Sequence, residues 1–433
     1  MRVYLQLTTV VASLLLVPAA AGAQGHMLHG VGPINSSMAG AGAGLPEDSL
    51  AALMYNPALI GAEPGNQITF STEFFKDGIQ IDITLANGRK GHAEGTTLLG
   101  IIPAFGWKVR DPSKKLGLGF GLIGIAGFHT DYKQDTASII FDKPGNGGFG
   151  RIFTDYNVTK IPVAFSFEAT PKVTIGASLN VYRGNLAIAP LPFQVFDKVA
   201  VTTPVAPAGT VFYPEGGNMV GSWAIAGQFG IALKPMEMIS IGASITTPQN
   251  FAPYEWNSYY ADPTSPRYGE HRPLSYDLDG PLVINFGVGL KPNAATAIAI
   301  DGQWNRYKGV EGFGSPGGIV NGIVQPFGWR DILAFKAGVK RQVNAKVNVR
   351  AGYSFSQMPI KPENVLTATG AVATFQNHFT GGAGIAMFPF LTAEASFYIV
   401  PREHVEGPYL IQPGTIDSSN KLTSAIIGLN FKF

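Results

Sequence analysis

The chain has 433 residues, and its 31 Lys and Arg against 29 Asp and Glu give a formal net charge of +2. This length fits one large domain or two ordinary ones. Because no dense Lys/Arg block accompanies the small charge, the sequence gives no sign of nucleic-acid binding. Charged residues make up 14% of the chain, against about 25% in typical soluble domains, and Gly is abundant while Cys is absent. The composition excludes both an acidic soluble protein and a polytopic helical one.

The N-terminus has the three regions of a secretory signal peptide. Arg2 supplies the positive charge, Val10 to Val17 form a short apolar core, and Ala21-Gly22-Ala23 is a small-residue cleavage pattern. A membrane anchor would need about 20 uninterrupted apolar residues, and Pro18 argues against one. We expect residues 1–23 to be a cleaved signal peptide, with the mature chain starting at Gln24 and exported.

From residue 66 the sequence changes to segments of about ten residues that alternate apolar with small or polar side chains. In the last segment, Thr423, Ala425, Ile427 and Leu429 share one face, whereas Ser424, Gly428, Asn430 and Lys432 share the other. Successive side chains of a strand point to opposite faces, so each segment has one apolar face and one face of small or polar residues.

About fourteen such segments occur, an even number as bacterial membrane barrels require. Short connections containing Pro, Lys or Asn alternate with long ones such as 184–221 and 248–280, which is typical of a membrane barrel. The segments lie near 66–75, 97–108, 115–128, 156–169, 172–183, 222–234, 237–247, 281–291, 295–307, 331–341, 344–355, 377–388, 391–400 and 422–433.

The orientation of the two faces decides between a membrane barrel and a soluble β-sandwich or barrel. Small and charged residues could not fill the dry interior of a soluble barrel this wide, so they must line a lumen while the apolar face meets lipid. Closure also satisfies the backbone groups, as lipid requires. We predict an all-β fold, a 14-stranded antiparallel transmembrane β-barrel.

The segment before the strands is rich in Gly, Ala, Ser and Pro and contains three motifs. Gly32 to Gly44 form a small-residue run, Glu47-Asp48 an acidic pair, and Asn56-Pro57-Ala58 a short signature. Together with the run from Trp329-Arg330-Asp331-Ile332 to Gly352-Tyr353-Ser354 and the later Met358-Pro359-Ile360, these motifs resemble the FadL/TodX family of outer-membrane transport proteins. The likeness covers essentially the mature chain.

The resemblance implies residues 24–65 as an N-terminal plug, or hatch, inside a barrel formed by 66–433. It also implies a passive channel that binds hydrophobic compounds, either long-chain fatty acids or aromatic hydrocarbons, at the outer face. The plug then rearranges, and the compound leaves sideways into the membrane without an energy source. No carboxylate-binding residue of the family can be matched here. The terminal Phe433 resembles the signature recognised by the outer-membrane assembly machinery.

Asn56-Pro57 predicts a stiff turn, because Pro fixes φ and Asn side chains bond nearby backbone. The pair, with Ala58, is either a plug elbow beside the substrate path or an ordinary turn that ends a plug helix across 48–55.

The third strand carries the candidate lateral gate. Leu116 to Leu122 alternate bulky residues with Gly119 and Gly121, and after Leu122 the phase slips so that Ile123 takes the bulky role beside Gly124. A one-residue slip sends side chains to the other wall unless a bulge restores the register. We predict that the strand bends inward near Gly121 to Gly124 and opens a lateral gate. The alternative is a strand that is apolar on both sides because it packs against the plug.

Inward-facing charges and aromatic side chains are candidates for ligand contact. Lys336, Lys340 or Arg350 could hold a carboxylate head group, or belong to a solvated or mutually paired lumen lining. Aromatic side chains could build an apolar site or an interfacial girdle. The candidate ligand contacts are Phe74, Phe105, Phe128 and Trp256.

The seven His residues show no metal-ligand spacing, and neither a nucleophile elbow nor a phosphate loop is present. We therefore expect no enzyme activity, no cofactor and no metal.

Two other functions remain open: a general polar-solute porin, which predicts an open lumen, and an outer-membrane barrel lipase, for which His129 or His378 would need a Ser partner. The expected partners are a hydrophobic ligand, outer-membrane lipid or detergent, and the assembly machinery.

Overall fold

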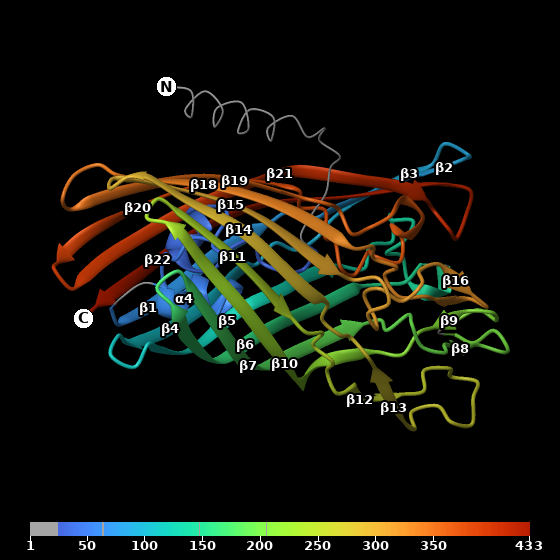
Figure 1. Cartoon of the computed structure of the whole chain (residues 1–433). Coiled ribbons are helices and arrows are strands. Elements are labelled where there is room, and N and C mark those ends of the chain that lie inside the picture. Colours follow the sequence, from blue (N-terminus) through green and yellow to red (C-terminus); the bar gives the residue numbers. More distant parts are fainter. Residues whose placement is uncertain (1–24, 63–64, 147, 205) are drawn as a thin grey trace.

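The computed structural model of the chain describes residues 25–62, 65–146, 148–204 and 206–433. The predicted signal peptide, residues 1–23, and the predicted mature start at Gln24 lie outside the described residues. Within them the protein is a closed β-barrel with long strands, and a set of short helices lies inside it (Figure 1).

The barrel is a ring of fourteen antiparallel strands, which confirms the predicted fold class. The ring closes where the first strand pairs with the last, from Gln67↔Lys432 to Asp77↔Leu422. In ring order the strands are β1 (Gln67–Asp77), β4 (Leu99–Asp111), β5 (Leu116–Tyr132), β6 (Ile152–Thr170), β7 (Val173–Ala189), β10 (Gly216–Met236), β11 (Ile239–Thr246), β14 (Leu282–Asn293), β15 (Thr296–Arg306), β18 (Ile332–Gln342), β19 (Val347–Ser356), β20 (Asn377–Phe388), β21 (Leu391–Pro408) and β22 (Gly414–Lys432).

Each ring strand coincides with one predicted segment, but several run further toward the side of the long loops. β21 continues to Pro408, β22 begins at Gly414, and β10 begins at Gly216. These extensions lie beyond the lipid belt, where no side needs to be apolar, so the period-2 signal that marks the strands fades there.

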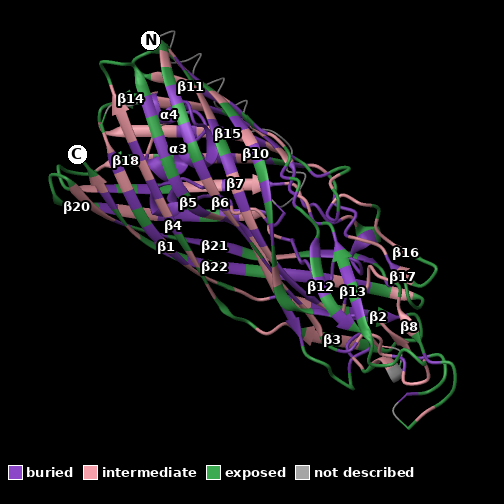
Figure 2. Ribbon diagram, turned by 90° about the horizontal axis from the view of Figure 1, so that it is seen from below, coloured by how far each residue is buried: buried purple, intermediate pink, exposed green. Residues whose placement is uncertain are grey.

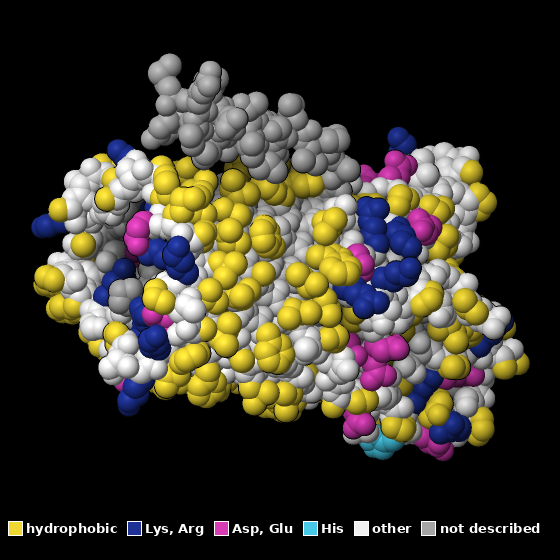
Figure 3. Space-filling view, viewed as in Figure 1, with side chains coloured by type: hydrophobic (Ala, Val, Ile, Leu, Met, Phe, Trp, Pro, Cys, Tyr) yellow, Lys and Arg dark blue, Asp and Glu magenta, His cyan; other side chains and the backbone are white. Residues whose placement is uncertain are grey.

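On the face shown in Figure 3, apolar side chains cover the middle of the outer wall, and charged side chains gather toward both ends of the barrel. This apolar belt consists of outward-facing side chains that alternate with buried small or polar ones. Members with more than half of their surface exposed include Ile101, Phe165, Leu179, Ile225, Phe286, Leu333, Phe397 and Ile427. Side chains of this kind would be expensive to leave in water, so the belt is the lipid-facing surface. None of the described helices is long and apolar enough to cross a membrane.

The connections at one end are tight turns, and those at the other end are long loops with small sheets of their own. β2 (Gln80–Leu85) extends the barrel wall by pairing with the outer part of β22, and β3 (Lys90–Glu94) pairs with β2. The loop sheets are β8 (Asp197–Lys198) with β9 (Val211–Phe212), β12 (Tyr254–Tyr259) with β13 (His271–Tyr276), and β16 (Ile319–Val320) with β17 (Ile323–Val324).

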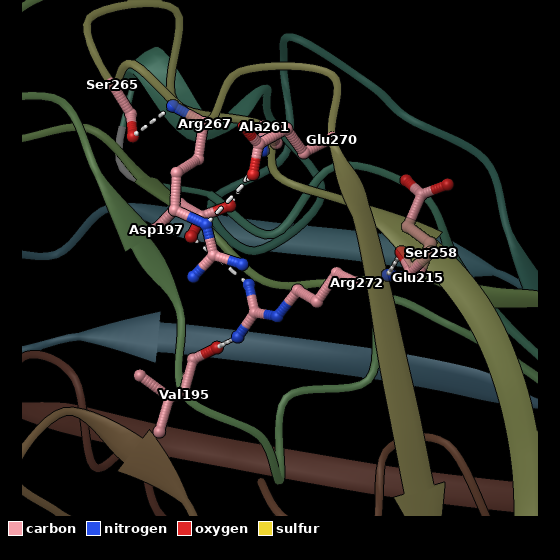
Figure 4. A network of polar contacts seen from close by, with 9 residues as sticks. All are labelled: Val195, Asp197, Glu215, Ser258, Ala261, Ser265, Arg267, Glu270 and Arg272. Carbon is pink, nitrogen blue, oxygen red and sulfur yellow. Dashed lines mark hydrogen bonds and ion pairs between the residues drawn. The ribbon is translucent and has the colours of Figure 1, made fainter.

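A buried polar network ties two of these loops together (Figure 4). Asp197, from the loop between β7 and β10, forms an ion pair of 3.1 Å with Arg272 of β13 and accepts a hydrogen bond of 2.7 Å from the backbone N–H of Ala261. Arg272 also donates to the backbone carbonyl of Val195. These two outer loops are therefore linked to each other, and we call the linked pair the loop roof.

Candidate functional site

Residues 25–62 fill the barrel interior with three short helices, α2 (Gly32–Ser37), α3 (Ser49–Tyr55) and α4 (Leu59–Ala62). All three are almost wholly buried (Figure 2). α2 packs against β19 to β22, α3 against β1, β4 and β5, and α4 against β4 to β7. Asp48 caps the N-terminus of α3: its carboxylate accepts a hydrogen bond of 2.7 Å from the Ala51 N–H. Burial raises the pKa of Asp48 to about 6.

The plug backbone lies directly on the inner wall at strand glycines. A Cβ added to Gly287 of β14 would lie 2.7 Å from the amide nitrogen of Gly44, and one added to Gly338 of β18 would lie 2.7 Å from the carbonyl oxygen of Met38. Both distances are shorter than a side chain can tolerate. These positions therefore need glycine because backbone approaches backbone there.

Asn56 connects the plug to the wall. Its side-chain amide donates hydrogen bonds to the carbonyls of Ala43 (2.9 Å) and Ile231 in β10 (3.0 Å), and its Oδ1 accepts one from the Ala58 N–H (3.1 Å). The side chain is fully buried. Asn56 thus ends α3, as the helix-end alternative predicts, and also holds the plug against β10. The role of Asn56, Pro57 and Ala58 beside a substrate path stays a prediction.

A buried charged pair holds the other side of the plug. Asp301 of β15 accepts hydrogen bonds from the N–H groups of Gly42 (2.6 Å) and Ala43 (2.7 Å). Lys336 of β18 donates to the carbonyl of His29 (3.1 Å) and to Gln303 Oε1 (2.7 Å). These wall residues satisfy plug backbone groups that would otherwise be buried without partners.

Of the three predicted head-group cations, Lys336 and Arg350 have partners within the protein, and Lys340 lies near the end of the barrel that carries the tight turns. Lys336 binds the plug, and Arg350 of β19 forms a buried ion pair of 2.8 Å with Glu394 of β21. Lys340 is half-buried and lines a cavity beside the turn residues 293–297. None of the three cations lines the apolar cavity described below.

The third barrel strand, β5, separates from its neighbour halfway along its length. β4 and β5 pair from Asp111↔Leu116 as far as Ala104↔Ile123, yet β4 continues to pair with β1 up to Leu99. On its other edge, β5 shifts register against β6 between Gly124 and Ala126. The bulge lies next to the position where the sequence predicts a phase slip, and it turns the outer half of β5 away from β4.

The start of the plug takes the place that β4 leaves free. The Leu28 N–H donates to the carbonyl of Ile125 (2.9 Å), and the Gly127 N–H donates to the carbonyl of His26 (3.0 Å). Met27 forms an isolated antiparallel bridge with Ala126. Residues 26–28 thus act as a short substitute strand on the inward-turned part of β5.

A cavity of about 510 Å³ lies between this substitute strand and the free edge of β4. Its outer wall includes Leu99, Ile101 and Leu122, which are also exposed on the lipid-facing belt. Its inner wall includes His29 of the plug and the buried side chains of His378 in β20 and Tyr398 in β21. The cavity therefore extends from the interior to the outer surface, at the place where β4 and β5 part.

The predicted gate residues occupy different sides of β5. Leu122 and Gly124 line the cavity, and Ile123 is fully buried on the inner side. A Cβ on Gly119 or Gly121 would instead press on Leu53 of the plug helix α3. The part of the strand before Ile123 thus packs against the plug, and only the part after it borders the opening.

The aromatic residues proposed as ligand contacts are also dispersed. Phe128 lines the cavity. Phe74 and Phe105 lie on the outward side of β1 and β4, where the alternation of burial points them at lipid. Trp256 is buried in the β12–β13 hairpin and donates to the carbonyl of Asn218 (2.9 Å).

Sequence reasoning missed the cavity residues that come from the loops and from the barrel strands far along the chain. Val372 and Phe375 line the cavity but lie in a loop that carries no distinguishing pattern. Tyr398 lies in the predicted segment 391–400, whose alternation does not mark it as a cavity residue. Among the described residues, no group of three or more His, Cys, Asp or Glu could hold a metal ion.

A closed fourteen-stranded barrel with an apolar belt, a filled interior and a cavity reaching its wall defines a plugged outer-membrane transport protein. The model of the outer-membrane transport protein family OMPP1/FadL/TodX matches residues 14–368, so the chain belongs to this family and lies in the outer membrane. The family transports hydrophobic compounds and consists of channels rather than enzymes.

Solved structures share the fold at low sequence identity. The toluene transporter TodX of Pseudomonas putida is 19% identical, with a TM-score of 0.69 over 94% of this chain and 99% of that one. A FadL homologue of Pseudomonas aeruginosa is 14% identical, with a TM-score of 0.70 over 94% and 99%. The toluene transporter TbuX of Ralstonia pickettii is 18% identical, with a TM-score of 0.66 over the same shares. No curated protein matches the sequence.

Proposed function

We propose that the protein is a passive channel from which a hydrophobic compound leaves sideways, through the opening between β4 and β5. The compound enters at the outer face, occupies the cavity beside β5, and passes Leu99, Ile101 and Leu122 into the membrane. The observation that carries this proposal is the continuity of the cavity with the lipid-facing belt. Toluene is named for two of the structural relatives, and long-chain fatty acids remain an equal candidate.

Lateral exit is the favourable route for an apolar molecule. Such a molecule gains about 25 cal/mol for each Å² of apolar surface that stays out of water, so a path that leads from an apolar cavity into lipid needs no energy source. The path along the barrel axis is occupied by α2, α3 and α4, which are buried. A general porin requires an open, polar lumen, so the filled interior favours the lateral channel.

The plug is the element that would respond to the ligand. Residues 26–29 line the cavity, and residues 26–28 also hold β5 in its bent position. A compound in the cavity therefore touches the same segment that sets the width of the opening. With this role, the chain divides into a signal peptide (1–23), a plug (24–65) and a barrel (66–433).

Blocking the opening tests the proposal. A Cβ on Gly124 would collide with the side chain of Ile102 across the opening, so Gly124→Leu should close it. The control is Gly302→Leu, because a Cβ on this strand glycine meets nothing within 4 Å. In cells that lack their own fatty-acid channel, uptake of radiolabelled oleate or toluene should fall to background with Gly124→Leu and stay normal with Gly302→Leu. Unchanged uptake by a folded Gly124→Leu barrel would contradict lateral exit.

A further inference from the structure

Two histidines form the polar inner end of the cavity. His29 comes from the plug and His378 from β20, and their ring centroids are 4.6 Å apart. Both line the cavity, and they expose only 3% and 5% of their surface. Phe375, Val372 and Leu422 are among the apolar residues that line the same cavity, together with the polar residues Asp77, His129 and Asp155.

One ring nitrogen of each histidine has no partner. Among the described residues, nothing bonds His29 Nε2 or His378 Nδ1. A buried polar atom without a hydrogen bond is costly, and native proteins usually give it a protein, water or ligand partner. The pair thus marks a place where a bound molecule can supply a hydrogen bond.

The charged groups around the pair are already engaged. Tyr398, which packs edge-on against His29, donates its hydroxyl to Glu73 (2.5 Å), and the same carboxylate oxygen accepts from Ser424 (2.8 Å). The Lys336 ammonium donates to the His29 carbonyl and to Gln303. Burial, together with the positive neighbour Lys336, holds the pKa of His29 well below its usual range, so this ring is neutral.

We propose, building on the channel function above, that the cavity prefers hydrophobic compounds that carry one uncharged hydroxyl group, placed between His29 and His378. A neutral imidazole offers one donor and one acceptor nitrogen, and a hydroxyl has one proton to donate and lone pairs to accept. It can therefore donate to one free nitrogen and accept from the other when the two rings present one acceptor and one N–H. A hydrocarbon leaves both nitrogens unsatisfied. A carboxylate brings a charge into a buried site whose cation is committed elsewhere, and that costs more than it returns.

The volume admits a molecule of moderate size. A cavity of roughly 150 Å³ holds benzene, and this one measures about 510 Å³. A phenol with a short alkyl chain therefore fits, with the chain directed toward Leu122 and the opening. Butylbenzene, 4-butylphenol and 4-butylbenzoate share one apolar skeleton and differ only in the polar group, which makes them a matched set of probes.

Titration calorimetry of the full barrel in detergent tests the preference. We expect 4-butylphenol to bind about tenfold more tightly than butylbenzene, the effect of one buried hydrogen bond, and 4-butylbenzoate to bind most weakly. His378→Phe should remove the advantage of the phenol over butylbenzene measured in the same variant, whereas His378→Gln, which keeps polar atoms, should restore part of that advantage. His29→Phe serves as the second variant. Heat-dependent migration on gels confirms that each barrel is folded.

The outcomes separate this inference from the channel function. Equal affinity for the phenol and the hydrocarbon, or tightest binding of the benzoate, would overturn the hydroxyl preference while the channel function stands. A phenol advantage that survives both Phe variants would overturn the assignment to the histidine pair. Failure of all three probes to bind, combined with normal uptake by Gly124→Leu cells, would count against the channel function itself.

Discussion

Replacement of Asn56 by Ala should loosen the plug without unfolding the barrel. The change removes the hydrogen bonds to the carbonyls of Ala43 and Ile231 and the one from the Ala58 N–H. Leaving a buried polar group unpaired costs about 1–3 kcal/mol. Ile231 is paired with Ala243 in the ladder between β10 and β11. We therefore assign most of the lost docking free energy to the unpaired Ala43 carbonyl and expect a loss of about 2 kcal/mol in total. That is roughly a thirtyfold rise in the population of undocked plug.

The absence of Cys from the sequence makes this rise measurable. A single cysteine introduced at Ala52, which is buried in α3, is protected while the plug is docked. If docking and undocking are fast relative to labelling, the rate of reaction with a membrane-impermeant maleimide follows the undocked population. Asn56→Ala should therefore raise the labelling rate about thirtyfold, and the heat stability of the barrel should stay close to that of the parent.

Two further variants check the reasoning. Asn87→Ala removes an asparagine whose side chain bonds only within an exposed turn, and labelling should not change. Asn56→Asp keeps Oδ1 but replaces the donor by a charged acceptor that faces two carbonyls, so its effect should exceed that of Ala. Identical labelling rates for the parent and Asn56→Ala would refute the idea that this side chain holds the plug.

The remaining predictions concern Asp301 and the loop roof. Asp301→Asn weakens two charge-assisted hydrogen bonds to Gly42 and Ala43, so labelling at position 52 should rise about tenfold; a rate equal to that of the exposed control Asp135→Asn would contradict this role. Asp197→Ala removes the ion pair with Arg272, so trypsin should cut after Lys198 faster on intact cells while barrel heat stability stays the same. An unchanged rate of cleavage would show that other contacts hold the loop.

The barrel could be predicted because lipid imposes one rule on every strand. Outward residues must be apolar and inward ones need not be, so alternation marks the strands wherever lipid is present. Leu333 and Val339 are exposed on β18, whereas Ala334 and Lys336 between them are buried. The rule loses its force outside the belt, which explains why the extensions of β21 and β22 were not anticipated.

The binding cavity could not be predicted, because its walls come from segments far apart in the sequence. His29 meets His378 only after the ring has closed and the plug has docked. The inward cations were ambiguous for a related reason. Alternation places Lys336 and Arg350 inside the barrel, but it does not reveal whether the plug, a carboxylate neighbour or a ligand meets them there.

Pro162 is a feature of the sequence that favours the bend in β5. The ladder between β5 and β6 skips Gly121 and Leu122, which lie opposite Pro162 and its neighbour, and Pro has no N–H to donate. β4 leaves the other edge of β5 after Ile123. The segment around 121–125 is therefore weakly held on both edges.

Residues 26–28 supply the backbone bonds that this part of β5 lacks on the side of β4. Displacement of the N-terminal segment would leave the Gly127 N–H and the Ile125 carbonyl without partners, a cost of about 1–3 kcal/mol each unless β5 closes back onto β4 or water enters. The position of the plug thus biases the position of β5. In the proposed channel, a ligand that displaces residues 26–28 from the cavity changes the opening through which it leaves.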